Sequence, residues 1–318
     1  MSLFADYIAR QTPLIVDGAL ATEMEARGAD LHDSLWSARY LFTQPQLIHD
    51  VHADYIAAGA DIVITASYQA TIAGFLARGW TQSQAEQLIR TSVALAQSAR
   101  DAWWDANAAT TSRLRPLVAG SIGPYGAYTA DGGEYRGNYG LSLTELKNFH
   151  RERMRILVDA GVDLLACETI PDLVEAQALA ELLGEFPGVV AWMSLSCQSG
   201  SQTCAGQSLV EVATCLRQYP QIVAIGANCT PPQYMPEIIA TLRAHSPQAV
   251  VVYPNSGETY DGAMGTWHGT VTCDDYVQAA QTWLAAGAHL IGGCCRTNPA
   301  MIAGLRAAFL SKGADDAI

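Results

Sequence analysis

Eight short apolar runs recur along the chain, and a helical stretch follows each of them. The runs are mostly continuous rather than alternating, which is typical of parallel strands covered on both faces. The predicted strands are residues 14–19, 61–66, 116–121, 162–167, 189–195, 222–228, 249–253 and 289–293. The predicted helices are residues 45–58, 82–103, 143–160, 173–183, 209–217, 232–244, 273–286 and 299–310.

Eight strand–helix units of about 40 residues each predict a closed (β/α)8 barrel of the TIM type, with its active site at the carboxyl ends of the strands. A doubly wound sheet with an accessory lobe is the competing architecture. Its dinucleotide-binding form carries G-x-G-x-x-G after the first strand, whereas this chain has Gly18-Ala19-Leu20-Ala21 there. Because we find no linker, charge block or low-complexity tract, we expect residues 1–318 to form a single barrel domain.

The charge balance narrows the range of partners. The formal net charge is −13, which disfavours binding to nucleic acid or to an anionic membrane surface. The first residues lack the apolar core of a signal peptide, and no run of 18 apolar residues occurs. We therefore expect a cytoplasmic protein that binds small molecules, with its eight cysteines in a reducing compartment.

Three cysteines fall at the carboxyl ends of predicted strands. Cys229 follows the sixth strand, and Cys294 and Cys295 follow the eighth. Adjacent residues of a regular strand point to opposite faces, so this pair must lie just past the strand end. Gly292 and Gly293 would give the backbone the freedom for such a turn.

Three thiolates that share one metal ion leave a fourth coordination position open, as in catalytic rather than structural zinc sites. Such an electron-rich site activates water poorly, but it is well matched to holding a substrate thiol as a thiolate. We interpret the remaining cysteines as buried core residues: Cys167, Cys197, Cys204, Cys215 and Cys273.

Two acidic residues also end predicted strands. Asp17 ends the first strand and Glu168 the fourth, and their carboxylates would accept hydrogen bonds from a substrate ammonium group. The backbone amides from Gly18 onward would receive a substrate carboxylate. On local grounds alone, Asp17 is equally well explained as a cap or turn residue. Together with the cysteines, these groups indicate a site for a thiol-bearing amino acid.

Polar and aromatic residues complete the predicted substrate site. Asn228 and Asn255 lie at the ends of the sixth and seventh strands, Tyr68 follows the second, and Trp36 lies in the loop after the first. Aromatic faces with acidic neighbours favour a cationic ligand such as a sulfonium or a quaternary ammonium.

Several segments of the chain resemble the zinc-dependent homocysteine S-methyltransferases: DGA (17–19), ETIPD (168–172), ANC (227–229), YPNSGE (253–258) and GGCCRT (292–297). The loop DGGEYRGNYG (131–140) resembles the branch that uses S-methylmethionine or S-adenosylmethionine. The resemblance implies one Zn²⁺ per chain, held by Cys229, Cys294 and Cys295. It also implies that Asp17 and Glu168 hold the amino group of homocysteine.

The resulting hypothesis is methyl transfer from a sulfonium donor to homocysteine, forming methionine. Betaine is the alternative donor, but betaine-using relatives have a tyrosine where this chain has Thr169. A Schiff-base enzyme is disfavoured because the two lysines, Lys147 and Lys312, lie away from the strand ends. A non-enzymatic zinc or redox sensor built on the cysteines is the remaining alternative.

Overall fold

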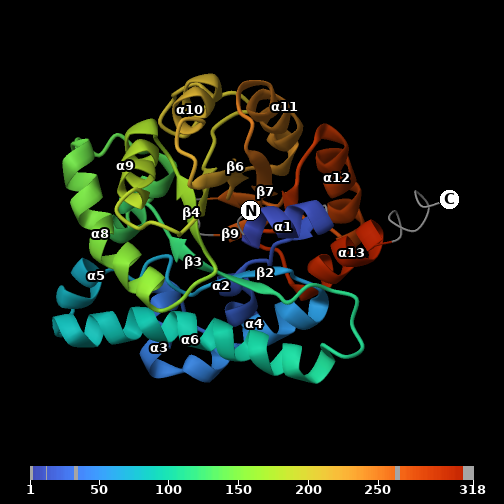
Figure 1. The fold of residues 1–318 in the computed structure, drawn as a ribbon, viewed down its shortest axis with the longest axis horizontal. Coiled ribbons are helices and arrows are strands. Elements are labelled where there is room, and N and C mark those ends of the chain that lie inside the picture. The colour runs from blue at the N-terminus through green and yellow to red at the C-terminus, as the bar shows by residue number, and fades with distance from the viewer. Residues whose placement is uncertain (1–2, 12, 32–34, 262–265, 311–318) are drawn as a thin grey trace.

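Eight parallel strands form a barrel in the computed structural model, which describes residues 3–11, 13–31, 35–261 and 266–310. The strand order is β1-β10-β7-β6-β5-β4-β3-β2, and a parallel bridge from Val16 to Ile62 joins β1 to β2. The strands are β1 Leu14–Ile15, β2 Ile62–Ile64, β3 Leu117–Ile122, β4 Leu164–Ile170, β5 Ala191–Leu195, β6 Ile222–Asn228, β7 Ala249–Tyr253 and β10 Leu290–Ile291. The predicted (β/α)8 architecture is confirmed (Figure 1).

The helices surround this barrel. The long ones are α4 Pro45–Ala58, α6 Gln82–Asn107, α8 Leu143–Asp159, α9 Leu173–Leu183, α10 Leu209–Leu216, α11 Met235–His245, α12 Cys273–Ala286 and α13 Pro299–Leu310. Four of them, α4, α9, α12 and α13, have the predicted bounds. The predicted helix 232–244 instead begins with a 3-10 turn, η3 Pro232–Tyr234.

Three strands are much shorter than the sequence pattern predicts: β1 and β10 have two residues each where 14–19 and 289–293 are predicted, and β2 has three where 61–66 is predicted. The backbone past β10 still forms hydrogen bonds with the neighbouring strand segments. The Gly292 amide donates to the Val252 carbonyl at 3.0 Å, and the Gly293 amide donates to the Asp17 carbonyl at 3.0 Å.

Short elements that the sequence pattern did not predict fill the connections. They are α1 Leu3–Arg10, α2 Leu20–Ala26, η1 Trp36–Arg39, α3 Tyr40–Thr43, α5 Ile72–Leu76, α7 Tyr125–Thr129, η2 Gly133–Tyr135, and the antiparallel strands β8 Thr259–Asp261 and β9 Thr266–His268. Helix α1 lies across the centre of the barrel in the view of Figure 1. Its Phe4 and Tyr7 pack with Leu14, Ile62 and Leu117 and so cover the amino-terminal end of the barrel.

The core has two layers, because each strand is covered on both faces. One layer lies inside the barrel and includes Trp192, and the larger layer lies between the strands and the helices. Gly226 of β6 lies so close to β7 that an added Cβ would be 1.6 Å from the Val251 carbonyl oxygen. The barrel therefore admits only glycine at this position.

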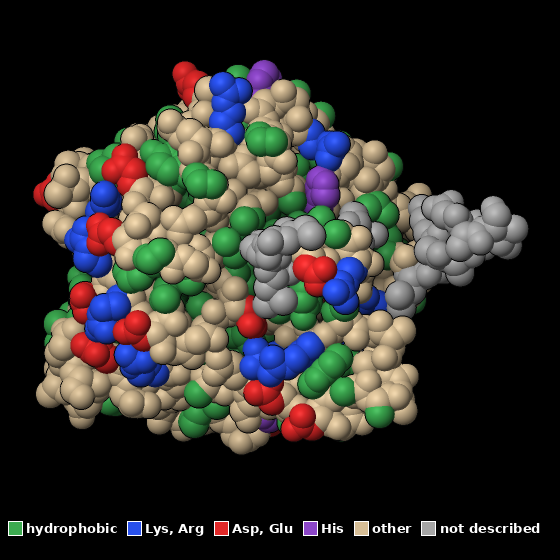
Figure 2. Space-filling model, in the orientation of Figure 1, with side chains coloured by type: hydrophobic (Ala, Val, Ile, Leu, Met, Phe, Trp, Pro, Cys, Tyr) green, Lys and Arg blue, Asp and Glu red, His purple; other side chains and the backbone are tan. Residues whose placement is uncertain are grey.

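Acidic and basic side chains are interspersed on the face shown in Figure 2. Ion pairs also join neighbouring elements, such as Arg151 of α8 with Glu185, which follows α9, at 2.8 Å. Among the described helices, none is long and apolar enough to cross a membrane.

Candidate functional site

Three sulfur atoms from distant parts of the chain meet at the carboxyl end of the barrel. Cys229 directly follows β6, and Cys294 and Cys295 lie in the turn after β10. Their Sγ atoms all lie within 4.8 Å of one another, with 3.8 Å between Cys229 and Cys295. The structure pairs Cys229 with Cys294 as a disulfide. As predicted, the vicinal pair lies past the strand end.

The donor set fits a thiophilic metal ion. Tetrahedral zinc with Zn–S bonds of about 2.3 Å would hold its sulfurs about 3.8 Å apart, and Cys229 and Cys295 already have this separation. Burial raises the pKa of the Cys295 thiol to about 11, so a cation is needed to favour its thiolate at neutral pH. No second cluster of metal-binding side chains occurs among the residues that the structure describes. The five cysteines interpreted as core residues lie outside the group. Cys167 and Cys197 are buried as predicted, but the prediction is wrong for Cys204, Cys215 and Cys273, which are partly exposed.

Left-handed backbone conformations concentrate at this end of the barrel. Trp36, Thr169, Cys229 and Arg296 all have positive φ, between 47° and 67°. Each such non-glycine residue costs on the order of 1–3 kcal/mol, and such strain persists where the surrounding structure enforces it. At Cys229 the sharp turn brings the thiol towards the other two sulfurs immediately after the strand ends.

The prediction that Gly292 and Gly293 give the backbone freedom to turn is wrong. Neither has a positive φ, and the turn after the cysteines is made by Arg296. A Cβ on Gly292 would lie 2.8 Å from the Asp17 carbonyl oxygen, and one on Gly293 would lie 2.4 Å from Thr297 Oγ1. These glycines allow close packing rather than an unusual turn.

Glu168 accepts hydrogen bonds from two residues on other strands of the barrel. The Ser121 hydroxyl donates to Oε1, and the Tyr253 phenol donates to Oε2 at 3.2 Å. Tyr253 in turn accepts a hydrogen bond from Trp192 Nε1 at 3.0 Å. Burial raises the pKa of Glu168 to about 7, although the hydrogen bonds from Ser121 and Tyr253 oppose that rise. The carboxyl group is thus oriented but only half ionised at neutral pH.

Asp17 is the second buried carboxylate, with 3% of its surface exposed. Its Oδ2 accepts from the Ile64 amide at 2.9 Å. Burial raises its pKa well above the ordinary value, and the charge of Glu168 raises it further. A cation between the two carboxylates would lower both pKa values, so the pair is arranged to bind positive charge.

Asn228 connects β6 to β4. Its Oδ1 accepts from the Thr169 amide at 2.8 Å, and its Nδ2 donates to Thr169 Oγ1 at 2.8 Å. The side chain also lies 4.0 Å from the Cys294 sulfur. The structure therefore gives Asn228 a positioning role between the carboxylate side and the thiol side of the site, and its substrate contact stays a prediction.

Gly18 packs against α4 without space for a side chain, since a Cβ would lie 2.8 Å from the ring of Tyr55. The next amide, of Ala19, donates to Thr297 Oγ1 at 3.1 Å, and the Tyr55 phenol donates to the Ala19 carbonyl at 3.1 Å. The amide of Ala19 is thus already bonded within the protein and is not free for the predicted carboxylate contact.

Trp36 and Tyr68 form an edge-to-face aromatic pair, with ring centroids 6.0 Å apart. Arg153, which is buried on α8, fixes this region by donating to the carbonyls of Tyr68, at 3.0 Å, and Gly123. Asn255 donates its amide to the Thr230 carbonyl at 3.2 Å, and its buried Oδ1 has no partner among the described residues. The binding roles predicted for these residues stay predictions.

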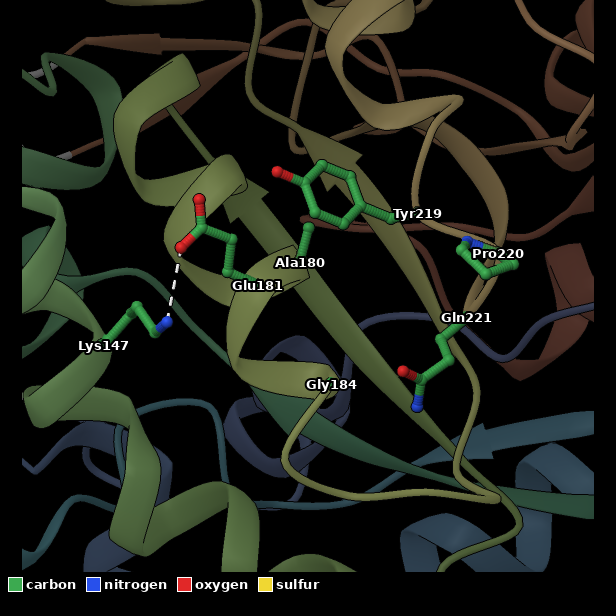
Figure 3. A pocket seen from close by; sticks show the side chains of 7 residues that line it. All are labelled: Lys147, Ala180, Glu181, Gly184, Tyr219, Pro220 and Gln221. Carbon is green, nitrogen blue, oxygen red and sulfur yellow. Dashed lines mark hydrogen bonds and ion pairs between the residues drawn. The ribbon is translucent and has the colours of Figure 1, made fainter.

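The pocket in Figure 3 lies elsewhere, between α8 and α9 and beside the segment that leads into β6. Lys147 and Glu181 form an ion pair across it at 3.3 Å. Lys147 thus lies away from the carboxyl ends of the strands, as predicted, and Lys312 lies outside the described residues. A second cavity is bordered by Thr22 and by the ion pair of Glu258 with Arg296, the residue after Cys295.

Sequence reasoning missed the residues that support the carboxylates. Ser121 hydrogen-bonds with Glu168 and is the last residue of the predicted strand 116–121 and the second-last of β3, so the strand-end rule would have found it. Glu134 has a buried carboxylate oxygen without a partner among the described residues, and no pattern in the sequence distinguishes it from an ordinary loop acid.

Comparisons with known proteins agree with this geometry. The family model for homocysteine S-methyltransferase matches residues 14–309. Homocysteine S-methyltransferase YbgG of Bacillus subtilis is 52% identical over 90% of this chain and 91% of its own length. Homocysteine S-methyltransferase of Escherichia coli is 50% identical over 94% of this chain and 96% of its own length.

A solved structure is also similar, namely the metallated form of the Escherichia coli homocysteine methyltransferase MmuM. It superimposes with a TM-score of 0.85 at 47% identity, over 94% of this chain and 97% of that one. With a barrel of this form, three clustered thiols at its mouth and relatives that align along almost their entire length, the chain belongs to the homocysteine S-methyltransferase family.

Proposed function

We propose that this methyltransferase moves a methyl group from a sulfonium donor, S-methylmethionine or S-adenosylmethionine, to the sulfur of homocysteine and so forms methionine. The observation that carries the proposal is the meeting of three thiols, all within 4.8 Å, with two buried carboxylates at one end of the barrel. This arrangement complements an amino acid that bears both a thiol and an ammonium group. The names of the relatives and the metal in the solved relative support it.

Cys229, Cys294 and Cys295 would hold one Zn²⁺. When bound there, zinc would lower the pKa of the homocysteine thiol and keep its sulfur as a nucleophilic thiolate. Asp17 and Glu168 would accept hydrogen bonds from the substrate ammonium, with Ser121 and Tyr253 fixing the orientation of Glu168. The amino acid would then be held at both ends, and its sulfur would be positioned for attack.

The transfer is a single displacement. The homocysteine sulfur forms a bond to the methyl carbon while the bond from that carbon to the sulfonium sulfur breaks, and its electron pair stays on the leaving thioether. A negative sulfur and a positive sulfur both become neutral, so low hydration favours the reaction. Asp17 and Glu168 have only 3% and 7% of their surface exposed, so this part of the site is poorly hydrated. With S-methylmethionine as donor, both products are methionine.

The reaction also sets requirements on the environment. Three thiol ligands must remain reduced, which is why we assign the enzyme to the cytoplasm. The disulfide between Cys229 and Cys294 would leave only one free thiol in the group, so assays need a reductant. We further propose that residues 1–318 act as one barrel domain and that the ligands are small molecules alone.

The test is metal analysis of the purified, reduced protein together with a methionine-formation assay. Homocysteine is offered with S-methylmethionine, S-adenosylmethionine, betaine or methyltetrahydrofolate in turn. We expect about one zinc per chain and activity with a sulfonium. Activity with betaine alone would refute the donor assignment, and full activity after complete metal removal would refute the whole proposal.

Two cysteine variants locate the metal. Cys229→Ala should lose both zinc and turnover, because two thiols remain in the cluster. Cys215→Ala is the matched control, since this thiol lies on α10 outside the cluster, and it should retain both. Bound zinc without turnover in the wild type would instead favour a zinc store over an enzyme.

A further inference from the structure

Glu134 is a half-buried acid that the reaction described so far does not use. It lies in η2, after α7, and its Oε2 is buried without a hydrogen-bond partner among the described residues. The neighbouring Arg136 lowers the pKa of Glu134, but its guanidinium pairs with Asp131, at 2.8 Å. A buried carboxylate oxygen without a partner is costly, so a compensating cation is expected.

The loop that carries Glu134 is rigidly built. Asp131 Oδ1 accepts from the Gly133 amide at 3.1 Å and from the Thr129 hydroxyl at 2.7 Å. Gly133 packs so closely on Gly126 of α7 that a Cβ would lie 2.8 Å from the Gly126 Cα atom. The backbone that carries Glu134 is therefore fixed by contacts within its own loop.

This position borders the candidate site. The Ser196 hydroxyl donates to the Glu134 carbonyl at 2.8 Å and also lies 3.4 Å from the Thr169 carbonyl. Thr169 is the residue that Asn228 holds, directly after Glu168. One hydroxyl group thus connects the loop to the strand end that carries the predicted ammonium site.

The charge of Glu134 reaches the aromatic side of the site. Burial is the main cause of the raised pKa of the Tyr68 phenol, and Glu134 raises it further. The carboxylate therefore acts on the aromatic pair of Trp36 and Tyr68.

A sulfonium has no N–H or O–H group, so it cannot be bound by hydrogen bonds to its charged centre. It is stabilised instead by carboxylate charge and by aromatic faces. We propose that Glu134, together with the Trp36–Tyr68 pair, recognises the positive sulfur of the methyl donor. This inference rests on the proposed function and names the residue that selects a cationic donor over a neutral one.

The expected effect is on donor binding. The donor loses its positive charge as the methyl group leaves, so the carboxylate stabilises bound donor more than the transition state. Glu134→Gln keeps the shape and removes the charge. Its KM for S-methylmethionine should rise about 10-fold or more, while kcat and the KM for homocysteine change less than about 3-fold.

A neutral isostere of the donor distinguishes charge recognition from a structural role of Glu134, because a structural role would not change the preference for the cationic donor over the isostere. In 2-amino-5-methylhexanoate a CH group replaces the sulfonium sulfur. The wild type should bind S-methylmethionine much more tightly than this analogue, and Glu134→Gln should lose that preference while its inhibition constant for the analogue is unchanged. Glu134→Asp, which keeps the charge, should keep the preference, and thermal unfolding of each variant checks its folding.

Glu25→Gln is the matched control, because Glu25 is an exposed acid of α2, outside the loop that carries Glu134. It should leave the donor KM unchanged. An equal rise of the donor KM in both Gln variants would show that any loss of negative charge near the site has this effect. That result would overturn the proposal. An unchanged donor KM in Glu134→Gln, or a raised KM for homocysteine instead, would also overturn this inference. Activity of the wild type with a sulfonium would in that case still support the proposed function. A wild type inactive with both sulfoniums would refute the proposed function and this inference together.

Discussion

Replacing Glu168 by glutamine should stabilise the metal-free protein while removing its affinity for homocysteine. Burial raises the pKa of Glu168 from its ordinary value of 4.5 to about 7. A carboxyl group whose pKa is higher in the folded state favours folding in its protonated form. Its contribution is complete below pH 4.5, the unfolded value, and is lost as the pH rises through 7.

The magnitude follows from the shift. A difference between 4.5 and 7 in pKa corresponds to about 3 kcal/mol of destabilisation of the wild type at pH 8, where Glu168 is ionised in both states. At pH 5 the carboxyl group is protonated in the folded state and only partly ionised in the unfolded state. The destabilisation of the wild type is then only about 1 kcal/mol. Glutamine does not titrate, and its altered hydrogen bonding with Tyr253 adds a cost that is independent of pH.

The assay is urea unfolding of the reduced, metal-free wild type and of Glu168→Gln at pH 5 and pH 8. The free energy of unfolding of the variant, relative to the wild type, should rise by about 2 kcal/mol between the two pH values. The pH-dependent difference is decisive, because the constant hydrogen-bond cost cancels. If the free energy of unfolding of the variant relative to the wild type did not change with pH, or fell as the pH rose, the reasoning would be refuted. Ionisation of the buried Glu168 would then not destabilise the wild type.

Three further predictions concern the same end of the barrel and its core. The KM for homocysteine should rise about 10-fold as the pH falls from 8 to 6, because Glu168, with a pKa of about 7, must be ionised to bind the ammonium; the KM of Glu168→Gln should lack this component. Asn228→Ala leaves the Thr169 amide without its partner and should lower the free energy of unfolding by about 1–3 kcal/mol. Turnover should fall more than this loss of stability explains if the hydrogen bonds between Asn228 and Thr169 position Glu168. Gly226→Ala places a Cβ 1.6 Å from the Val251 carbonyl oxygen and should cost about 3 kcal/mol or more, with Gly184→Ala, at a helix end, as a mild control; equal unfolding midpoints for the two would contradict the packing argument.

The strand and helix order could be read from the sequence because each element is specified locally. The bounds of β6, β7, α4 and α12 agree with the prediction, since their apolar runs end at turn or cap residues. The short strands β1 and β10 could not be predicted, because their apolar runs continue past the last paired residue. The point at which pairing stops depends on the neighbouring strand across the barrel.

The sequence by itself determined the barrel class and placed Cys229, Cys294, Cys295, Asp17 and Glu168 at strand ends, because the carboxyl ends of parallel barrel strands meet at one face. Only the tertiary structure decided how these groups are held. The hydrogen bonds to Glu168 come from Ser121 and Tyr253, on strands far apart in the chain. The burial of Glu134 Oε2 without a partner likewise depends on the tertiary structure. Burial and long-range hydrogen bonding set the pKa values and orientations of these side chains, and neither is written in any local pattern of residues.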